Sequence, residues 1–138
     1  MGLIQISTQV NAPADKVWDI ISDLDSETKY WKGTKQITNI SKQENKITRE
    51  ITLVFRDSKC MQQITLLPKE KIKAVFTDGI LKGTKTINLK SGDKGVSLEA
   101  VWDIKLSGMM GMFTGMVKKH IKNGTEQALQ SIKEEAER

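Results

Sequence analysis

Cysteine, histidine and arginine are scarce in this sequence, and each scarcity narrows the chemistry open to the chain. Cys60 is the only cysteine, so no internal disulfide can form. His120 is the only histidine, which argues against a zinc site built from histidine and cysteine ligands. The arginines are limited to Arg49, Arg56 and Arg138. Because arginine is the side chain that most often reads bases and grips phosphates, we expect no nucleic-acid partner.

Long apolar runs are missing as well. No stretch approaches the roughly 20 apolar residues of a membrane-spanning helix, and the N-terminus shows no basic and then apolar signal region. We therefore expect a cytoplasmic protein. The length of 138 residues predicts a single domain over residues 1–138 with a sizeable core.

Familiar catalytic motifs are also absent. The sequence has no Gly-x-Ser-x-Gly elbow, no phosphate-binding Walker loop and no dinucleotide-binding glycine pattern. Asp23 and Asp25 are close in sequence, but we interpret them as residues that cap and end helices. Acidic residues that could converge on a metal ion cannot be placed together. We therefore predict no catalytic residue, no metal and no cofactor.

The net charge of +5 comes mostly from lysines that are scattered among acidic residues. This pattern is typical of a solvated surface, and a transient contact with an anionic membrane surface is the alternative. Apolar content of 38% and charged content of 28% are ordinary for a soluble globular protein.

Residues 109–135 have the spacing of one long amphipathic helix. Apolar residues recur at steps of three and four on one side, and charged and amide side chains occupy the other. The apolar positions are Met109, Met112, Phe113, Met116, Val117, Ile121, Ala128 and Ile132. Such a helix would run about 40 Å, which is too long to be buried end to end in a domain of this size. We expect it to lie across a broad sheet.

The first part of this predicted helix is unusual in composition. Residues 108–116 contain four of the six methionines and three glycines. Methionine fills irregular space and repacks around varied partners, whereas glycine lowers helix stability. Met112 and Met116 are therefore either ordinary core residues or part of a cavity that adapts to a ligand.

The rest of the chain indicates one strand, two short helices and then six more strands. Alternation of apolar and polar residues predicts strands at 2–10, 36–40, 47–55, 60–67, 72–77, 81–89 and 96–106. Between the first two strands, Pro13 and Asp15 open one helix, and residues 25–27 can cap a second that ends near Trp31. Short polar turns between the later strands indicate antiparallel neighbours. Consecutive strands with segregated helices favour the α+β class.

Three segments resemble the START-like (SRPBCC) superfamily, which includes birch-pollen-allergen-like proteins, polyketide cyclases and lipid-transfer domains. They are VNAPADKVWDIISDL at 10–24, YWKG at 30–33 and LSGMMGMF at 106–113. The resemblance covers essentially the whole chain and is specific to the superfamily, but not to one member. It implies a helix-grip fold, in which a seven-stranded curved antiparallel sheet wraps around a long C-terminal helix and leaves a hydrophobic cavity between them.

Eight side chains are candidates for binding a ligand in such a cavity. They are Trp31, Arg49, Phe55, Phe76, Trp102, Met112, Met116 and His120. The aromatic and methionine side chains would form apolar walls, although each could equally be filled core. His120 is either a polar anchor or proton-transfer group, or a hydrogen-bonded structural histidine. Arg49, in phase with buried residues, could pair with a ligand carboxylate or phosphate, or else form a structural ion pair with a strand neighbour or be exposed on a bent strand.

Three functional hypotheses follow. The first is a non-enzymatic protein that binds or transports a lipid-like, isoprenoid-like or aromatic small molecule. The second, suggested by the resemblance to cyclases and dehydratases, is an enzyme that uses His120 and Arg49 in the same cavity. The third is a co-chaperone-like interaction module, which would require a large exposed apolar patch.

Overall fold

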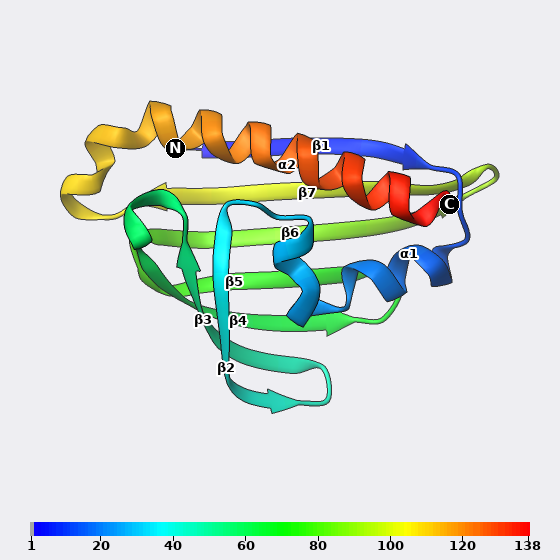
Figure 1. The fold of residues 1–138 in the computed structure, drawn as a ribbon, viewed down its shortest axis with the longest axis horizontal. Helices are drawn as coiled ribbons and strands as arrows, with labels where there is room; N and C mark the ends of the chain where they lie inside the picture. The colour runs from blue at the N-terminus through cyan, green and yellow to red at the C-terminus, as the bar shows by residue number, and fades with distance from the viewer. Residues whose placement is uncertain (1) are drawn as a thin grey trace.

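The computed structural model describes residues 2–138, apart from the side chains of Met109 and Met110. Within that part of the chain, seven strands form one antiparallel sheet in the order β1-β7-β6-β5-β4-β3-β2 (Figure 1). The strands are β1 (Gly2–Val10), β2 (Thr34–Gln43), β3 (Lys46–Leu53), β4 (Lys59–Leu67), β5 (Lys71–Gly79), β6 (Leu81–Gly92) and β7 (Gly95–Leu106). The helices are α1 (Ala14–Ile21), the 3-10 helices η1 (Leu24–Lys29), η2 (Phe55–Asp57) and η3 (Gly108–Phe113), and α2 (Thr114–Ala136).

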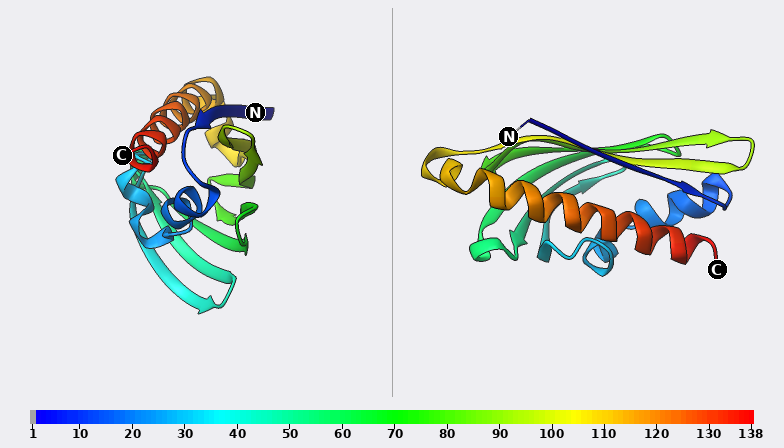
Figure 2. Two further views of the ribbon diagram at one scale, coloured as in Figure 1. Left: turned by 90° about the vertical axis from the view of Figure 1, so that its right-hand side faces the viewer. Right: turned by 90° about the horizontal axis from the view of Figure 1, so that it is seen from above.

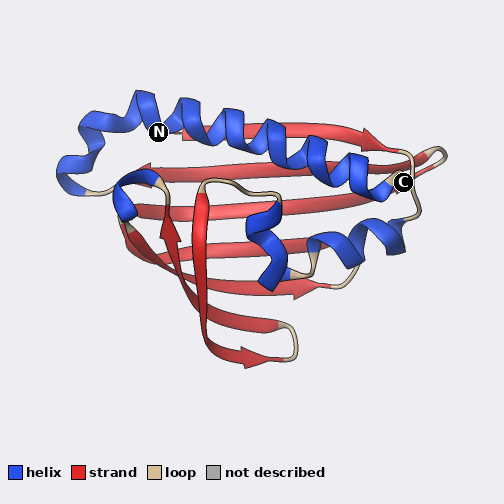
Figure 3. Ribbon diagram, in the orientation of Figure 1, coloured by secondary structure: helices blue, strands red, loops and turns tan. Residues whose placement is uncertain are grey.

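The sheet is curved, and α1 and α2 lie on the same face of it (Figures 2 and 3). This is the predicted α+β helix-grip arrangement, with two short helices after the first strand and a long helix at the C-terminus. β1 closes the order by pairing with β7, so the first and last strands are neighbours. Period-two burial is clearest on β7, where Leu98, Ala100 and Trp102 all face inward.

β6 approaches β7 closely at Gly83, and only glycine fits there. Gly83 has a backbone φ of +115°, and a Cβ at this position would lie 2.1 Å from the carbonyl oxygen of Asp103. A side chain would therefore strain the backbone and clash with the neighbouring strand. This glycine keeps the β6–β7 pairing intact beside the cavity described below.

The long helix begins later than its sequence pattern predicts. Residues 108–113 form the 3-10 helix η3, and the regular α-helix begins at Thr114, whose hydroxyl donates to the carbonyl oxygen of Gly111 at 2.6 Å. Glycines at 108 and 111 weaken α-helix formation in this segment, and Gly108 has a positive φ. The predicted inward side chain of Met109 lies outside the described residues.

The two halves of α2 pack differently against the sheet. The C-terminal half buries Ala128, Leu129, Ile132 and Ala136, and the last three join the core cluster that contains Val17 of α1. The N-terminal half buries only Val117 before Thr125 among the described residues. The C-terminal half of α2 therefore packs closely on the core, whereas the N-terminal half contacts the sheet through buried Val117 and partly buried Ile121.

Polar contacts also hold the C-terminal end of α2. Lys133 donates from Nζ to the carbonyl oxygen of Gln9 at 2.6 Å and to Glu137 Oε2 at 2.7 Å. The backbone N–H of Asn11 donates to the same carboxylate oxygen at 2.8 Å. These bonds join the end of α2 to the link between β1 and α1 (Figure 1).

The connection between β3 and β4 also differs from the prediction. β3 ends at Leu53 instead of continuing to Phe55, because Arg56 and Asp57 have positive φ values of 56° and 53° and turn the chain into η2. Phe55 packs edge-on against Phe113, with ring centroids 6.0 Å apart. The turn between β3 and β4 therefore contacts the residue that immediately precedes α2.

In the described part of the chain, no helix has both the length and the apolarity needed to cross a bilayer.

Candidate ligand-binding site

A cavity of about 670 Å³ lies between the sheet and the N-terminal half of α2. Its volume falls within the range of roughly 300–1,000 Å³ that is usual for small-molecule sites. From the sheet side, apolar walls come from Leu53, Phe55, Ile80, Leu81 and Trp102. From the helix side they come from Phe113, Met116, Val117 and Ile121. The cavity lies beneath the half of α2 that buries only Val117 before Thr125.

Gly124 leaves part of the helix wall open. It lines the cavity from the middle of α2, and a Cβ built on it would meet no atom within 4 Å. Glycine in a helix interior costs about 1 kcal/mol relative to alanine. At this position the missing side chain enlarges the cavity at the expense of helix stability.

Aromatic rings form the inner end of the cavity. Trp102 of β7 stacks on Phe76 of β5 with ring centroids 6.2 Å apart and planes at 19°. Trp31, which follows η1, meets Trp102 edge-on at 6.2 Å. The indole N–H of Trp102 donates to Thr125 Oγ1 at 3.0 Å, so the ring is held from α2 as well as from the sheet. These contacts make the inner wall rigid.

Lys85 is the buried cation of this inner wall. It lies on β6 between Ala74 of β5 and Trp102 of β7, and its side chain is 7% exposed. Its Nζ is 3.3 Å from the ring centroid of Trp31 and 4.9 Å from that of Trp102. Ammonium groups over indole faces gain about 0.5–2 kcal/mol each. The lysine is therefore held between two indoles at the surface of the cavity.

Burial shifts the protonation of this lysine. Desolvation lowers the pKa of Lys85 from its ordinary 10.5 to about 8, Glu27 opposes the shift, and Arg49 adds to it. The indole faces favour the charged form too, because the ring quadrupole attracts cations. At neutral pH the ammonium is therefore the main form.

An ion-pair network lies directly behind Lys85. Arg49, 1% exposed, pairs through Nη2 with Glu27 Oε2 at 2.8 Å and donates from Nε to Gln62 Oε1 at 2.8 Å. Arg49 also donates from Nη1 to the carbonyl oxygen of Leu24 at 3.4 Å. A hollow of about 20 Å³, enough for one water molecule, separates this network from Lys85.

The structure gathers five of the eight side chains predicted from sequence around the cavity. Trp31, Phe55, Trp102, Met116 and His120 all line it. His120 and Met116 are largely exposed and lie at its outer rim. A role for these five in ligand binding stays a prediction.

The other three predicted residues lie elsewhere. Phe76 is buried behind Trp102 as core, and Met112 is 78% exposed because η3 turns it away from the cavity. Arg49 is buried, and its ion pair does not lie within its own sheet. Its partner is Glu27 of η1, a residue distant in sequence that strand periodicity could not single out.

Lys85 is the residue that the sequence reasoning missed. It falls in phase with Leu81, Ile87 and Leu89, and all four are buried on β6. The sequence did contain a signal for Lys85, because this lysine lies on the apolar side of a strand in which apolar and polar residues alternate. The same signal drew attention to Arg49 on β3.

Nucleophilic and metal-binding groups do not gather in the cavity. Cys60 is buried on β4, where desolvation raises the pKa of its thiol. Within the described residues, no group of three or more histidine, cysteine, aspartate or glutamate side chains could hold a metal ion. The chemistry of the cavity therefore centres on Lys85 and the exposed His120.

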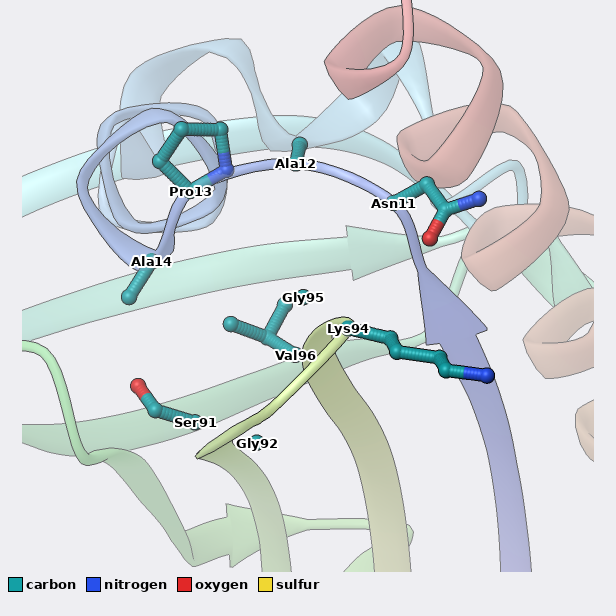
Figure 4. Close-up of a pocket in the computed structure, with 9 residues that line it drawn as sticks. All are labelled: Asn11, Ala12, Pro13, Ala14, Ser91, Gly92, Lys94, Gly95 and Val96. Atoms are coloured by element: carbon teal, nitrogen blue, oxygen red, sulfur yellow. The ribbon is translucent and has the colours of Figure 1, made fainter.

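A second hollow of about 660 Å³ lies at the opposite end of the sheet (Figure 4). It is formed by residues 11–14, which lead into α1, and by the turn between β6 and β7. Apart from Lys94, the side chains that line it are small. Lys94 extends away from Ser91 and Ala14 (Figure 4). Lacking aromatic walls or convergent polar groups, this hollow is a poor candidate for a specific site.

A model of the family described as polyketide cyclase / dehydrase and lipid transport matches residues 1–137. The chain belongs to this family. Its START-like fold follows from the same match and from the arrangement of sheet and helices described above. Membership in the polyketide cyclase / dehydrase and lipid transport family leaves open which ligand the cavity accepts.

Solved structures of other proteins share the fold at low sequence identity. The Zhui aromatase/cyclase from a Streptomyces species is 15% identical, with a TM-score of 0.79 over 99% of this chain and 93% of that one. A protein of Thermus thermophilus is 12% identical, with a TM-score of 0.81 over 96% of this chain and 94% of that one. A START superfamily protein from Mycobacterium smegmatis is 13% identical, with a TM-score of 0.68 over 96% and 99%. The sequence matches no curated protein.

Proposed function

We propose that the protein binds a hydrophobic small molecule in the cavity between the sheet and α2. The observation that carries this proposal is the 670 Å³ cavity with mainly apolar walls between the sheet and the N-terminal half of α2. A cavity of this size and lining suits a lipid-like, isoprenoid-like or aromatic molecule, because burial of its apolar surface drives binding. The family description, which includes lipid transport, supports the same function.

A variant that fills the cavity tests this function. Gly124→Leu places an isobutyl group where the cavity is open, and Gly115→Leu places the same group on the same helix outside the cavity. Both positions are free of atoms within 4 Å of a Cβ, so neither change creates a clash there. The two variants thus differ mainly in whether they occupy the cavity.

The probe is Nile red, a neutral apolar dye whose fluorescence rises in apolar surroundings. We expect saturable binding to the wild type and to Gly115→Leu, and binding at least about tenfold weaker to Gly124→Leu. Circular dichroism confirms that each variant is folded. Dye that fails to bind the wild type, or that binds all three proteins equally, contradicts the proposal.

The second candidate function is cyclase or dehydratase chemistry in the same cavity. It is favoured by a titratable group at the inner wall, Lys85, and by the resemblance in fold to the Zhui aromatase/cyclase. The earlier candidates support it less well, because His120 is exposed at the rim and Arg49 is engaged with Glu27. Turnover of an aromatic polyketide substrate that is lost in Lys85→Met, with binding retained, would favour this function over simple binding.

The described residues give the interaction-module hypothesis little support. The exposed large apolar side chains are Leu3, Ile40, Val54, Leu67, Met112 and Met116. They come from β1, β2, β4, η3 and the lining of the cavity, not from one face of one element. Scattered exposed apolar residues are normal on soluble proteins.

A further inference from the structure

All charged or titratable side chains that line the large cavity are basic. Lys32, Arg56 and His120 lie at its exposed rim, and Lys85 lies buried at its inner wall. No aspartate or glutamate is among the lining residues that the structure describes. An anionic group is therefore attracted to the entrance and finds a cation inside.

The charges in and behind the inner wall do not cancel. Arg49 and Lys85 are positive and Glu27 is negative, which leaves one positive charge when all three are ionised. Glu27 is bound to Arg49 at 2.8 Å. Among the described residues, no carboxylate oxygen lies within 4.0 Å of Lys85 Nζ.

A buried ammonium with no carboxylate in direct contact is costly, and the two indole faces and the more distant Glu27 offset only part of that cost. A carboxylate reaching Lys85 would complete its pairing with a charge-assisted hydrogen bond. The indoles also favour the ammonium over the neutral amine, so an ion pair suits this lysine better than covalent attack on a carbonyl group. One negative charge can therefore be accommodated next to the Lys85 ammonium.

We propose that Lys85 anchors the acidic group of the ligand, so that the cavity selects amphiphilic monocarboxylates over neutral lipids of the same size. This inference rests on the proposed function, because it names the ligand class of the same cavity. The acid group lies against Lys85 between Trp31 and Trp102. The apolar tail extends past Ile121 and Val117 toward the rim.

The test compares dodecanoate with dodecanol, which share a chain length and differ in charge. Isothermal titration calorimetry at pH 7 measures each ligand on the wild type, on Lys85→Met and on Lys90→Met. Lys90 is the matched control, because it lies on the same strand with an exposed side chain. Methionine keeps the length of the lysine stem and removes the charge.

We expect dodecanoate to bind Lys85→Met about ten- to a hundredfold more weakly than the wild type, which is the usual worth of a hydrogen bond to a charged group. Dodecanol should bind the wild type and Lys85→Met within about threefold of each other. Lys90→Met should match the wild type with both ligands. Near-UV circular dichroism of the tryptophans checks that the inner wall is intact.

A second measurement needs only the wild type. Raising the pH from 7 to 9.5 takes Lys85 through its pKa of about 8 and removes its proton. Dodecanoate affinity should fall over this interval and dodecanol affinity should not. This measurement decides the question even if the Lys85 variant does not fold.

The outcomes separate the two proposals. Equal loss or no loss of dodecanoate and dodecanol binding in Lys85→Met overturns the anchoring role and leaves the cavity as a neutral lipid site. Failure of both ligands and of Nile red to bind the wild type overturns the binding function itself. Loss confined to dodecanoate supports the inference.

Discussion

The indole N–H of Trp102 donates to the hydroxyl oxygen of Thr125 at 3.0 Å. This bond joins the middle of β7 to the middle of α2 at the inner end of the cavity. Thr125 is fully buried, and its own hydroxyl donates to the carbonyl oxygen of Ile121 at 2.6 Å. One threonine thus sets both the position of the tryptophan and the point at which the helix meets the sheet.

Replacing this threonine with valine keeps the shape and removes the acceptor. Thr125→Val leaves the buried Trp102 N–H without a partner, so we expect the free energy of unfolding to fall by about 1–3 kcal/mol. Thr125→Ser retains the hydroxyl and should keep the bond, losing only a methyl group. Urea denaturation followed by tryptophan fluorescence measures both. A Thr125→Val protein as stable as the wild type would show that the hydrogen bond adds little to stability.

The Glu27–Arg49 pair is expected to be strongly coupled. Arg49→Met removes the buried cation and leaves Glu27 and Gln62 without their partner, which should cost about 3–5 kcal/mol of stability. The double variant Glu27→Gln/Arg49→Met should be destabilised by clearly less than the sum of the two single changes. A double-mutant cycle in urea measures this coupling. Additive losses would mean that the two side chains act independently despite their 2.8 Å separation.

Lys85 should reduce stability at neutral pH. In the unfolded chain its amine keeps the proton up to its ordinary pKa of 10.5, whereas in the fold burial lowers the pKa to about 8. Between these values the unfolded state binds more protons, so the contribution of Lys85 to the free energy of unfolding rises as pH rises. Below pH 8 its destabilising effect is present in full.

The comparison of wild type with Lys85→Met isolates this effect. We expect Lys85→Met to be more stable at pH 7 by about 1–3 kcal/mol, after allowing for the lost contacts with the indoles. The difference should shrink between pH 8 and pH 10.5. Urea denaturation at several pH values measures it, with Lys90→Met as the control. A Lys85→Met protein that is less stable at every pH would show that the indole contacts outweigh the cost of burial.

The sequence by itself determined the class of fold. Period-two alternation on the strands, helical spacing over residues 109–135 and the short polar turns were enough to predict an antiparallel sheet crossed by a long terminal helix, and the family resemblance implied the curvature of the sheet. Such patterns are local consequences of side-chain geometry, so they survive without knowledge of distant contacts. The inward position of Trp102 could be read from the same alternation.

The tertiary structure decided which of these residues surround the cavity. The exposure of Met112 depends on a helix that starts at Thr114, and the pairing of Arg49 depends on η1 reaching β3. Lys85 becomes a site residue only because β7 and the segment after η1 bring two indoles onto it. Periodicity tells which face of an element is buried, but not which distant element covers that face. Charge pairing and cavity lining depend on the covering element, so they emerge only when the whole chain is folded.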